Sequence, residues 1–149
     1  MKWLNHLILN QGNNWRTISR FVGVTDTLDT GPMIIQGPDL PNLLEGHCVV
    51  NSDDVMKALI TGGRTSTLGS SASSATHIFS FVEQTWQQGP LLTNRRFFHA
   101  CGILKDGNDY IIVVAGGLDD QDSMLNSVEL YNFGAGVSWY AGPEMINPR

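Results

Sequence analysis

Short apolar runs separated by glycines and polar segments predict an all-β chain. The clearest run, Tyr110 to Ala115, is apolar at every position and ends at Gly116-Gly117. A run of this length without alternation is typical of a strand that is buried on both faces. Further strands are expected at 98–104, 127–132 and 137–141, with a hairpin turn at 105–108. Together they predict a four-stranded antiparallel unit with almost no helix.

The same landmarks recur along the chain at a nearly constant interval. Three of the four Gly-Pro pairs begin at 37, 89 and 142, and the Gly-Gly pairs begin at 62 and 116, so the steps are 52, 53 and 54 residues. His47 and His99 are 52 residues apart, and Trp86 and Trp139 are 53 apart. An interval of roughly 40–50 residues is typical of β-propeller blades. Trp86 and Trp139 are therefore predicted to occupy equivalent sites in successive units.

The interval divides the chain into units. The unit before the clearest one is expected to have strands at 47–50, 56–61, 77–82 and 84–87, a turn at 51–54, and Phe81 in the place of Tyr131. Its Ser/Thr-rich loop, Arg64 to Thr76, is expected to be mobile. Strands at 3–9, 15–24 and 33–36 would make a partial unit. The predicted organisation is a partial blade at 1–38, whole blades at 39–88 and 89–142, and the start of another at 143–149. The predicted fold class is an incomplete β-propeller of four-stranded antiparallel blades.

Composition and charge narrow the functional classes. The chain has 149 residues, of which 42% are hydrophobic and 15% charged, so one domain can bury a core. A net charge of −5 without a basic stripe argues against nucleic acid as the main partner. No run approaches the ~20 apolar residues of a membrane span, and no signal-peptide pattern opens the chain. Cys48 and Cys101 have no Cys-x-x-Cys spacing and are expected to be reduced, buried thiols. These observations favour a cytoplasmic location.

The second whole unit resembles the Kelch repeat. The matching residues are Arg96-x-x-His99-Ala100, an apolar strand, Gly116-Gly117, a polar loop, Ser127 to Tyr131, and Trp139. In the preceding unit Leu44 stands in place of the arginine. The resemblance implies β-propeller blades and a non-enzymatic scaffold or adaptor that binds a protein or peptide partner and needs no cofactor. Open blade edges would also permit self-association. The alternative is a fragment of a propeller enzyme, such as a Kelch-like oxidase or sugar isomerase, whose catalytic groups come from several blades or another domain.

No catalytic, cofactor-binding or metal-binding residue is predicted. The chain has no Gly-x-Ser-x-Gly, phosphate-binding glycine loop or His-Glu-x-x-His motif. His47 and His99 have no carboxylate at ligand spacing, so structural hydrogen bonding is the expected role of both. The sequence therefore points to binding rather than catalysis.

Six charged residues are the candidates for contact with a partner. Arg96, and Arg149 in the same phase, match an arginine that faces the central pocket in Kelch domains that bind acidic peptides. The alternative is that Arg96 merely pairs with a neighbouring carboxylate or backbone carbonyl at the blade edge. The loops after the two Gly-Gly pairs leave the second strand at the same point of the repeat, so they are expected on the same rim of the blades. They differ in length and chemistry, as loops that bind partners on a rigid scaffold often do. They carry the other four candidates, Arg64, Asp119, Asp120 and Asp122.

Overall fold

The computed structural model describes residues 6–8, 17–22, 33–39, 45–52, 54–64 and 71–149. Within these ranges the chain forms strands and no helix, which confirms the all-β prediction. The described residues contain no helix that is long and apolar enough to cross a bilayer. Near the N-terminus an antiparallel sheet has the order β1-β2-β3, with bounds His6–Ile8, Thr17–Val22 and Met33–Asp39.

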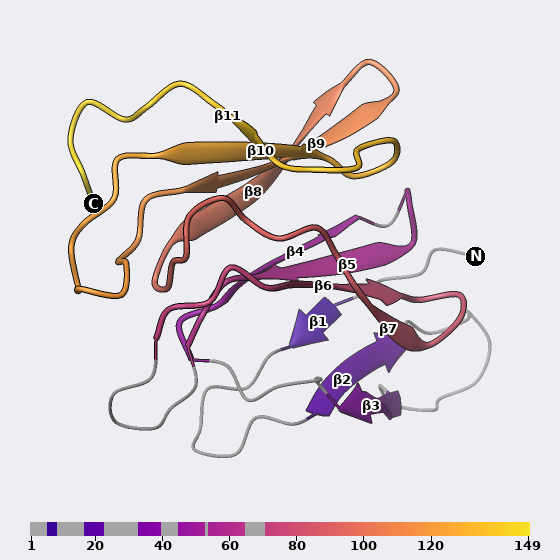
Figure 1. Cartoon of the computed structure of the whole chain (residues 1–149). Helices are drawn as coiled ribbons and strands as arrows, with labels where there is room; N and C mark the ends of the chain where they lie inside the picture. The colour runs from indigo at the N-terminus through magenta and orange to yellow at the C-terminus, as the bar shows by residue number, and fades with distance from the viewer. Residues whose placement is uncertain (1–5, 9–16, 23–32, 40–44, 53, 65–70) are drawn as a thin grey trace.

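Two four-stranded antiparallel sheets follow, and each is a simple meander (Figure 1). The first sheet has the order β4-β5-β6-β7, with bounds Cys48–Ser52, Lys57–Thr61, Thr76–Ser80 and Thr85–Gln88. The second sheet is β8 to β11 in order, with bounds Ala100–Asp106, Asp109–Ala115, Val128–Asn132 and Tyr140–Ala141. Gly107, at φ +60°, turns the β8–β9 hairpin as predicted. The turn predicted at 51–54 begins later, because Asn51 and Ser52 still pair with β5.

The strand register relates one sheet to the other. Phe79 pairs with Ala58 in the first sheet, as Tyr131 pairs with Ile112 in the second. Phe79 therefore occupies the place of Tyr131, and the prediction that gave this place to Phe81 was wrong by two residues.

Each unit has a tryptophan whose ring packs against the equivalent aromatic residue. Trp86 lies 5.0 Å from Phe79 and Trp139 lies 5.2 Å from Tyr131 between ring centroids, and both ring pairs are tilted. The indole N–H of Trp139 donates to the carbonyl of Pro90 at 2.9 Å, which satisfies its polar atom inside the core. The similar ring contacts support the prediction that the two tryptophans occupy equivalent sites.

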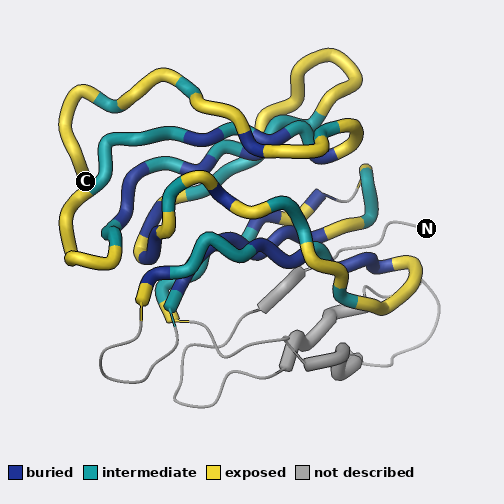
Figure 2. The backbone as a smooth tube through the Cα atoms, viewed as in Figure 1, coloured by how far each residue is buried: buried dark blue, intermediate teal, exposed yellow. Residues whose placement is uncertain are grey.

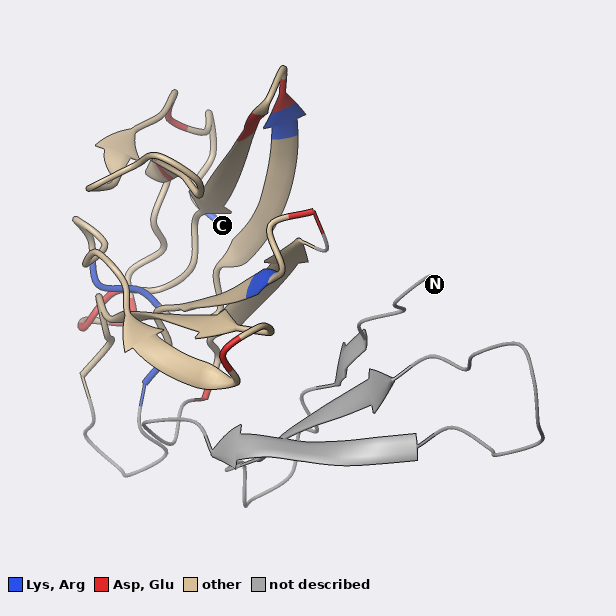
Figure 3. Ribbon diagram, turned by 90° about the vertical axis from the view of Figure 1, so that its right-hand side faces the viewer, with Lys and Arg blue, Asp and Glu red and all other residues tan. Residues whose placement is uncertain are grey.

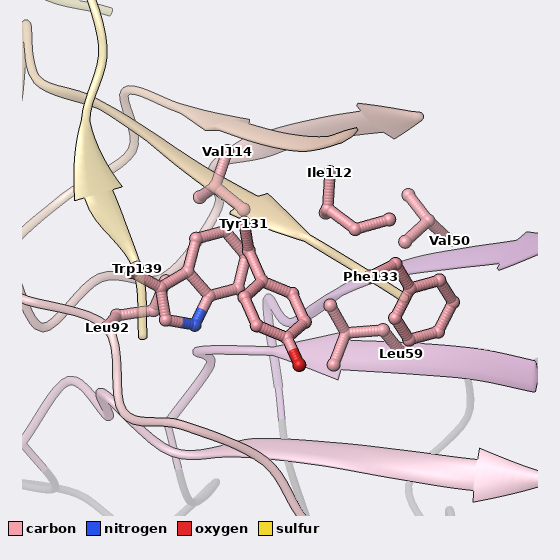
Figure 4. Packing of buried hydrophobic residues seen from close by; sticks show 8 residues of the cluster. All are labelled: Val50, Leu59, Leu92, Ile112, Val114, Tyr131, Phe133 and Trp139. Carbon is pink, nitrogen blue, oxygen red and sulfur yellow. The ribbon is translucent and has the colours of Figure 1, made fainter. Parts of the chain in front are cut away.

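The main core lies between the two sheets. Figure 2 shows the buried residues concentrated along the strands, with the connections and hairpin tips exposed. Leu59 of the first sheet and Ile112 and Val114 of the second are fully buried. The rings of Tyr131, Phe133 and Trp139 fill the space between them (Figure 4). A second cluster of Ala58, Phe79 and Phe81 lies on the other face of the first sheet, so β5 is buried on both faces.

A disulfide joins the two sheets. Cys48 on β4 and Cys101 on β8 are bonded, with their Cα atoms 6.0 Å apart. The prediction of two reduced thiols was wrong, because the first strands of neighbouring sheets pack together and turn these two side chains toward each other. The bond closes a sequence separation of 53 residues.

Candidate functional site

The Gly-Gly turns hold the chain of the following unit against the end of each sheet. A Cβ on Gly62, which has φ +59°, would lie 2.5 Å from the carbonyl oxygen of Arg96. Only glycine fits this position. Next to it, the N–H of Gly63 donates to the same carbonyl at 2.9 Å, and the N–H of Arg96 donates to Ser73 at 3.1 Å. The start of the second unit therefore crosses the end of the first sheet.

The side chain of Arg96 then turns into its own unit and is fully buried. Its guanidinium donates to the carbonyl of Gly116 at 2.8 Å, to the carbonyl and hydroxyl of Ser127, and to Glu129 Oε1 at 2.9 Å. Glu129 is 2% exposed and also accepts the backbone N–H groups of Thr93 and Asn94. Arg96 therefore has the alternative role considered from the sequence, because it forms an ion pair within its own unit. It offers no exposed surface to a partner.

Charged and aromatic groups gather where the two loops after Gly-Gly meet. The Arg64 guanidinium lies 4.3 Å from the Phe97 ring centroid and pairs with Glu45 at 3.8 Å and Asp122 at 4.0 Å. Figure 3 shows basic and acidic segments next to each other at this end of the sheets. Because Arg64 and Asp122 come from different loops, their contact places the described start of the first loop beside the second loop. Residues 65–70 of the first loop, expected to be mobile, lie outside the described residues.

The remaining acidic candidates differ in role. Asp119 accepts the N–H groups of Gln121 and Ser123 at 2.8 and 2.9 Å, so its carboxylate shapes the loop itself. Asp120 pairs with Arg95 at 3.9 Å. The side chain of Asp122 is 74% exposed and is the most accessible of the three. Asp122 and Arg64 are therefore the better-placed candidates on this rim.

Sequence reasoning missed Phe98, which is exposed at the same rim. Its ring is 58% exposed although its backbone has φ +52°, a conformation that is costly for a bulky residue. The equivalent position in the first unit is Gly46, 52 residues earlier, which has φ +65°. The Phe98 N–H donates to the Gly46 carbonyl at 2.7 Å. Alignment of the two units at their histidines would have placed a phenylalanine opposite a glycine and revealed the position.

His99 ties the two sheets together rather than binding a metal. Its Nε2 lies 2.8 Å from Thr61 Oγ1, and the two atoms share a hydrogen bond. Burial, with the nearby charges of Arg96 and His47, lowers the pKa of His99 to about 3. Among the described residues no group of three or more His, Cys, Asp and Glu side chains could hold a metal ion. His99 is thus a neutral structural side chain, in agreement with its predicted role.

At the opposite end of the sheets an exposed cluster also links the two units. The Tyr110 hydroxyl donates to Asp54, and the Lys105 ammonium lies 3.5 Å from the same carboxylate. The hydrogen bond from Tyr110, then the charge of Lys105, lower the pKa of Asp54. The hydrogen bond with Tyr110, followed by the interactions with its charge and with Asp54, raises the pKa of Lys105. All three side chains lie at hairpin turns and none lines a buried site.

The chain after the second sheet repeats the path that leads into it. The N–H of Gly117 donates to the carbonyl of Arg149 at 2.8 Å, as Gly63 does to Arg96, and the N–H of Arg149 donates to Leu125 at 3.2 Å. Arg149 is exposed, whereas Arg96 is buried. Arg149 therefore matches Arg96 in its backbone and differs from it in its side chain.

Comparisons with known proteins give matches of structure alone. No protein-family model and no curated protein matches the sequence. A fungal alcohol oxidase of the AA5 family, solved in complex with copper, is similar with a TM-score of 0.69 and 16% identity over 90% of this chain. The structure of YjhT is similar with a TM-score of 0.68 and 9% identity over 88% of this chain. The chain spans 28% of the oxidase and 46% of YjhT, and both have β-propeller-like folds.

This finding corrects the prediction of a non-enzymatic protein. The chain matches an alcohol oxidase over nearly all of its length, so its fold is one that an enzyme uses. The prediction relied on the absence of catalytic motifs. That absence carries little weight, because the chain covers only 28% of the oxidase it resembles.

Proposed function

We propose that this chain forms consecutive blades of the β-propeller domain of an enzyme, and that the enzyme is an oxidase acting on alcohols. The structural similarity to the copper-bound alcohol oxidase over 90% of the chain carries the proposal. The two equivalent four-stranded sheets, packed face to face, are the geometry expected of neighbouring blades. The Kelch resemblance supports the same architecture, since the Gly-Gly turn, the tyrosine and the tryptophan each have a packing role in this fold.

No group of three or more His, Cys, Asp and Glu side chains among the described residues could hold a copper ion by itself, so these residues contribute mainly structure. The sulfur atoms of Cys48 and Cys101 are bonded to each other, and Nε2 of His99 shares a hydrogen bond with Thr61. Any metal in the complete enzyme would need ligands from outside the described residues. The role of this chain is to hold its rim, with Phe98, Arg64 and Asp122, in a fixed position on a rigid scaffold.

The disulfide bears on the compartment of the protein. Disulfides persist in oxidising environments and are rare in the cytosol, where thiols are kept reduced. The Cys48–Cys101 bond therefore supports an oxidising compartment over the cytoplasmic location favoured by the sequence.

The proposal is tested on the longest polypeptide that contains this chain, expressed under oxidising conditions and loaded with copper. The expected result is alcohol-dependent uptake of dioxygen together with tightly bound copper. The 149-residue chain alone serves as the matched control, and it should bind no copper stoichiometrically. Stoichiometric copper binding by the control would refute the assignment of the ligands. A folded, copper-loaded polypeptide that oxidises no primary alcohol would refute the proposed reaction.

A further inference from the structure

The connection between the two sheets contains the chain's only pair of adjacent basic residues, Arg95 and Arg96. It runs from Gln88 at the end of β7 to Ala100 at the start of β8 and forms no regular strand. Exposed connections of this kind are preferred sites of proteolytic cleavage. An endoprotease specific for paired basic residues would bind both arginines and cut the peptide bond that follows them, between Arg96 and Phe97.

The two arginines differ in accessibility. The side chain of Arg95 is 59% exposed, and its ion pair with Asp120 is long, at 3.9 Å. The side chain of Arg96 is fully buried and donates to the carbonyl of Gly116 at 2.8 Å and to Glu129 at 2.9 Å. Both of these acceptors belong to the second unit. A protease therefore reaches the first arginine of the pair, whereas the second sheet withholds the other.

The peptide bond after Arg96 is itself held on both sides. Its carbonyl oxygen accepts the N–H of Gly63 at 2.9 Å, and its N–H, which belongs to Phe97, donates to Leu118 at 3.0 Å. A serine endoprotease must bind that carbonyl oxygen in its oxyanion hole and pair with the backbone around it. Both hydrogen bonds must therefore break before the bond can be cut, and this requires the connection to leave the ends of both sheets.

The disulfide spans this site along the chain. Cys48 precedes the arginine pair and Cys101 follows it, and the two are bonded. Hydrolysis adds one water across the peptide bond and leaves a carboxylate on Arg96 and an ammonium group on Phe97. The two pieces, which carry the first and the second sheet, then stay joined through the same disulfide.

We propose that Arg95-Arg96 is a cryptic processing site for an endoprotease specific for paired basic residues, and that packing of the second sheet on Arg96 controls access to it. The site is cut only while the second sheet is open, and the product is two disulfide-linked pieces. Disulfides persist in oxidising compartments such as the secretory pathway, where proteases of this specificity also occur.

A cut at this bond changes the rim. The Phe97 ring lies 4.3 Å from the Arg64 guanidinium, and the N–H of Phe98 donates to Gly46 at 2.7 Å. Both contacts depend on a backbone that is anchored at Arg96. After cleavage the second piece begins at Phe97, so its two aromatic residues lose their attachment on one side and gain the positive charge of a chain terminus. The whole and the processed protein therefore present different rims.

The test treats the longest polypeptide that contains this chain, made under oxidising conditions, with a purified endoprotease specific for paired basic residues. A synthetic peptide with the sequence of residues 90–100 gives the rate for the unprotected site. The protein should be cut after Arg96 about a thousandfold or more slowly than the peptide, because only the opened form is a substrate. N-terminal sequencing should find the new terminus at Phe97, and the pieces should separate in gel electrophoresis only after reduction.

Four variants assign the protection. Glu129→Gln removes the charge that holds Arg96 and should speed cleavage about a hundredfold, since the rate follows the population of the opened form. Ser127→Ala removes an acceptor of Arg96 at 2.9 Å and should speed cleavage about tenfold, and it replaces Glu129→Gln if that variant does not fold. Arg95→Gln in the Glu129→Gln background should abolish cleavage, because the basic pair is broken. Glu83→Gln, at an exposed position of the first unit, is the matched control and should leave the rate unchanged.

Three results would overturn the proposal: a peptide that the enzyme does not cut, a protein that is cut as fast as the peptide, or equal rates for wild type, Ser127→Ala and Glu129→Gln. Pieces that separate without reduction would refute the role given to the disulfide. None of these readouts depends on oxidase activity, so failure of the proposed reaction would leave them unchanged.

Discussion

The buried pair of Arg96 and Glu129 gives the sharpest test of how the second unit is held together. Glu129→Gln keeps the size of the side chain, removes its charge and replaces one acceptor oxygen with a donor. The carboxylate accepts three N–H groups, from Thr93 at 2.6 Å, Asn94 at 3.0 Å and Arg96 at 2.9 Å. An amide must turn its NH₂ group toward at least one of these donors. One contact becomes repulsive, and the guanidinium loses its counter-charge.

The size of the effect follows from burial. Arg96 is 0% and Glu129 2% exposed, so water cannot replace the lost contacts. Hydrogen bonds to charged groups contribute roughly 1.5–3 kcal/mol each, and removal of one partner of a buried pair costs about 3–5 kcal/mol. The remaining acceptors of Arg96, the carbonyl of Gly116 and both oxygens of Ser127, soften the loss. We expect Glu129→Gln to lower the free energy of unfolding by about 3 kcal/mol.

Chemical denaturation followed by tryptophan fluorescence measures this loss. Glu83→Gln is the matched control, because Glu83 is exposed and makes only a long contact of 3.4 Å to Gln87. Its effect should stay within about 0.5 kcal/mol. A loss below about 1 kcal/mol for Glu129→Gln would refute the reasoning. So small a loss would mean that the Arg96–Glu129 pair hardly stabilises the fold. The Arg96 side chain could then turn outward, as a partner-binding residue must.

Three further predictions concern the junction between the two sheets. Replacing Cys48 and Cys101 by Ser should cost about 4 kcal/mol for a separation of 53 residues, measured by thermal denaturation under non-reducing conditions; an unchanged Tm would mean that the bond constrains little. His99 stays neutral in the fold with a pKa of about 3, below its unfolded value near 6.5, so the stability it supports is complete above pH 6.5 and falls as the pH drops toward 3. The slope should reach up to about 1.4 kcal/mol per pH unit and flatten in His99→Gln, and parallel profiles would contradict the assignment. Phe98→Gly should leave stability unchanged or raise it by about 1 kcal/mol, because the φ of +52° suits glycine, whereas Gly46→Ala should lower it; denaturant titration of both tests the claim, and a large loss in Phe98→Gly would show that its ring supports the fold.

Much of the fold could be predicted from the sequence because its landmarks are local. The apolar run before Gly116 forms β9 as predicted, but the prediction that it is buried on both faces was wrong, because only Ile112 and Val114, which face the first sheet, are fully buried. The repeat interval divided the chain into units, and the apolar runs within each unit predicted the four strands, in sequence order, that both sheets contain. Phe81 was misplaced although the 52-residue step between the histidines, counted back from Tyr131, leads to Phe79.

The candidate site was less predictable because exposure depends on neighbours that lie far along the chain. Arg96 is buried, and the partner that makes its burial possible is Glu129, which follows it by 33 residues. Phe98 could be recognised only by its unfavourable backbone conformation, a property of the folded chain.

The disulfide shows a general limit of arguing from the repeat interval. Equivalent residues lie on the same face of their sheets, so they cannot meet when two sheets stack in the same orientation. The residues that meet must be out of phase. His47 and His99 are 52 apart and equivalent, whereas Cys48 and Cys101 are 53 apart, and the extra residue turns Cys101 to the opposite face of its strand. The separation that makes the two cysteines look like copies of one position in fact puts their sulfur atoms on facing surfaces.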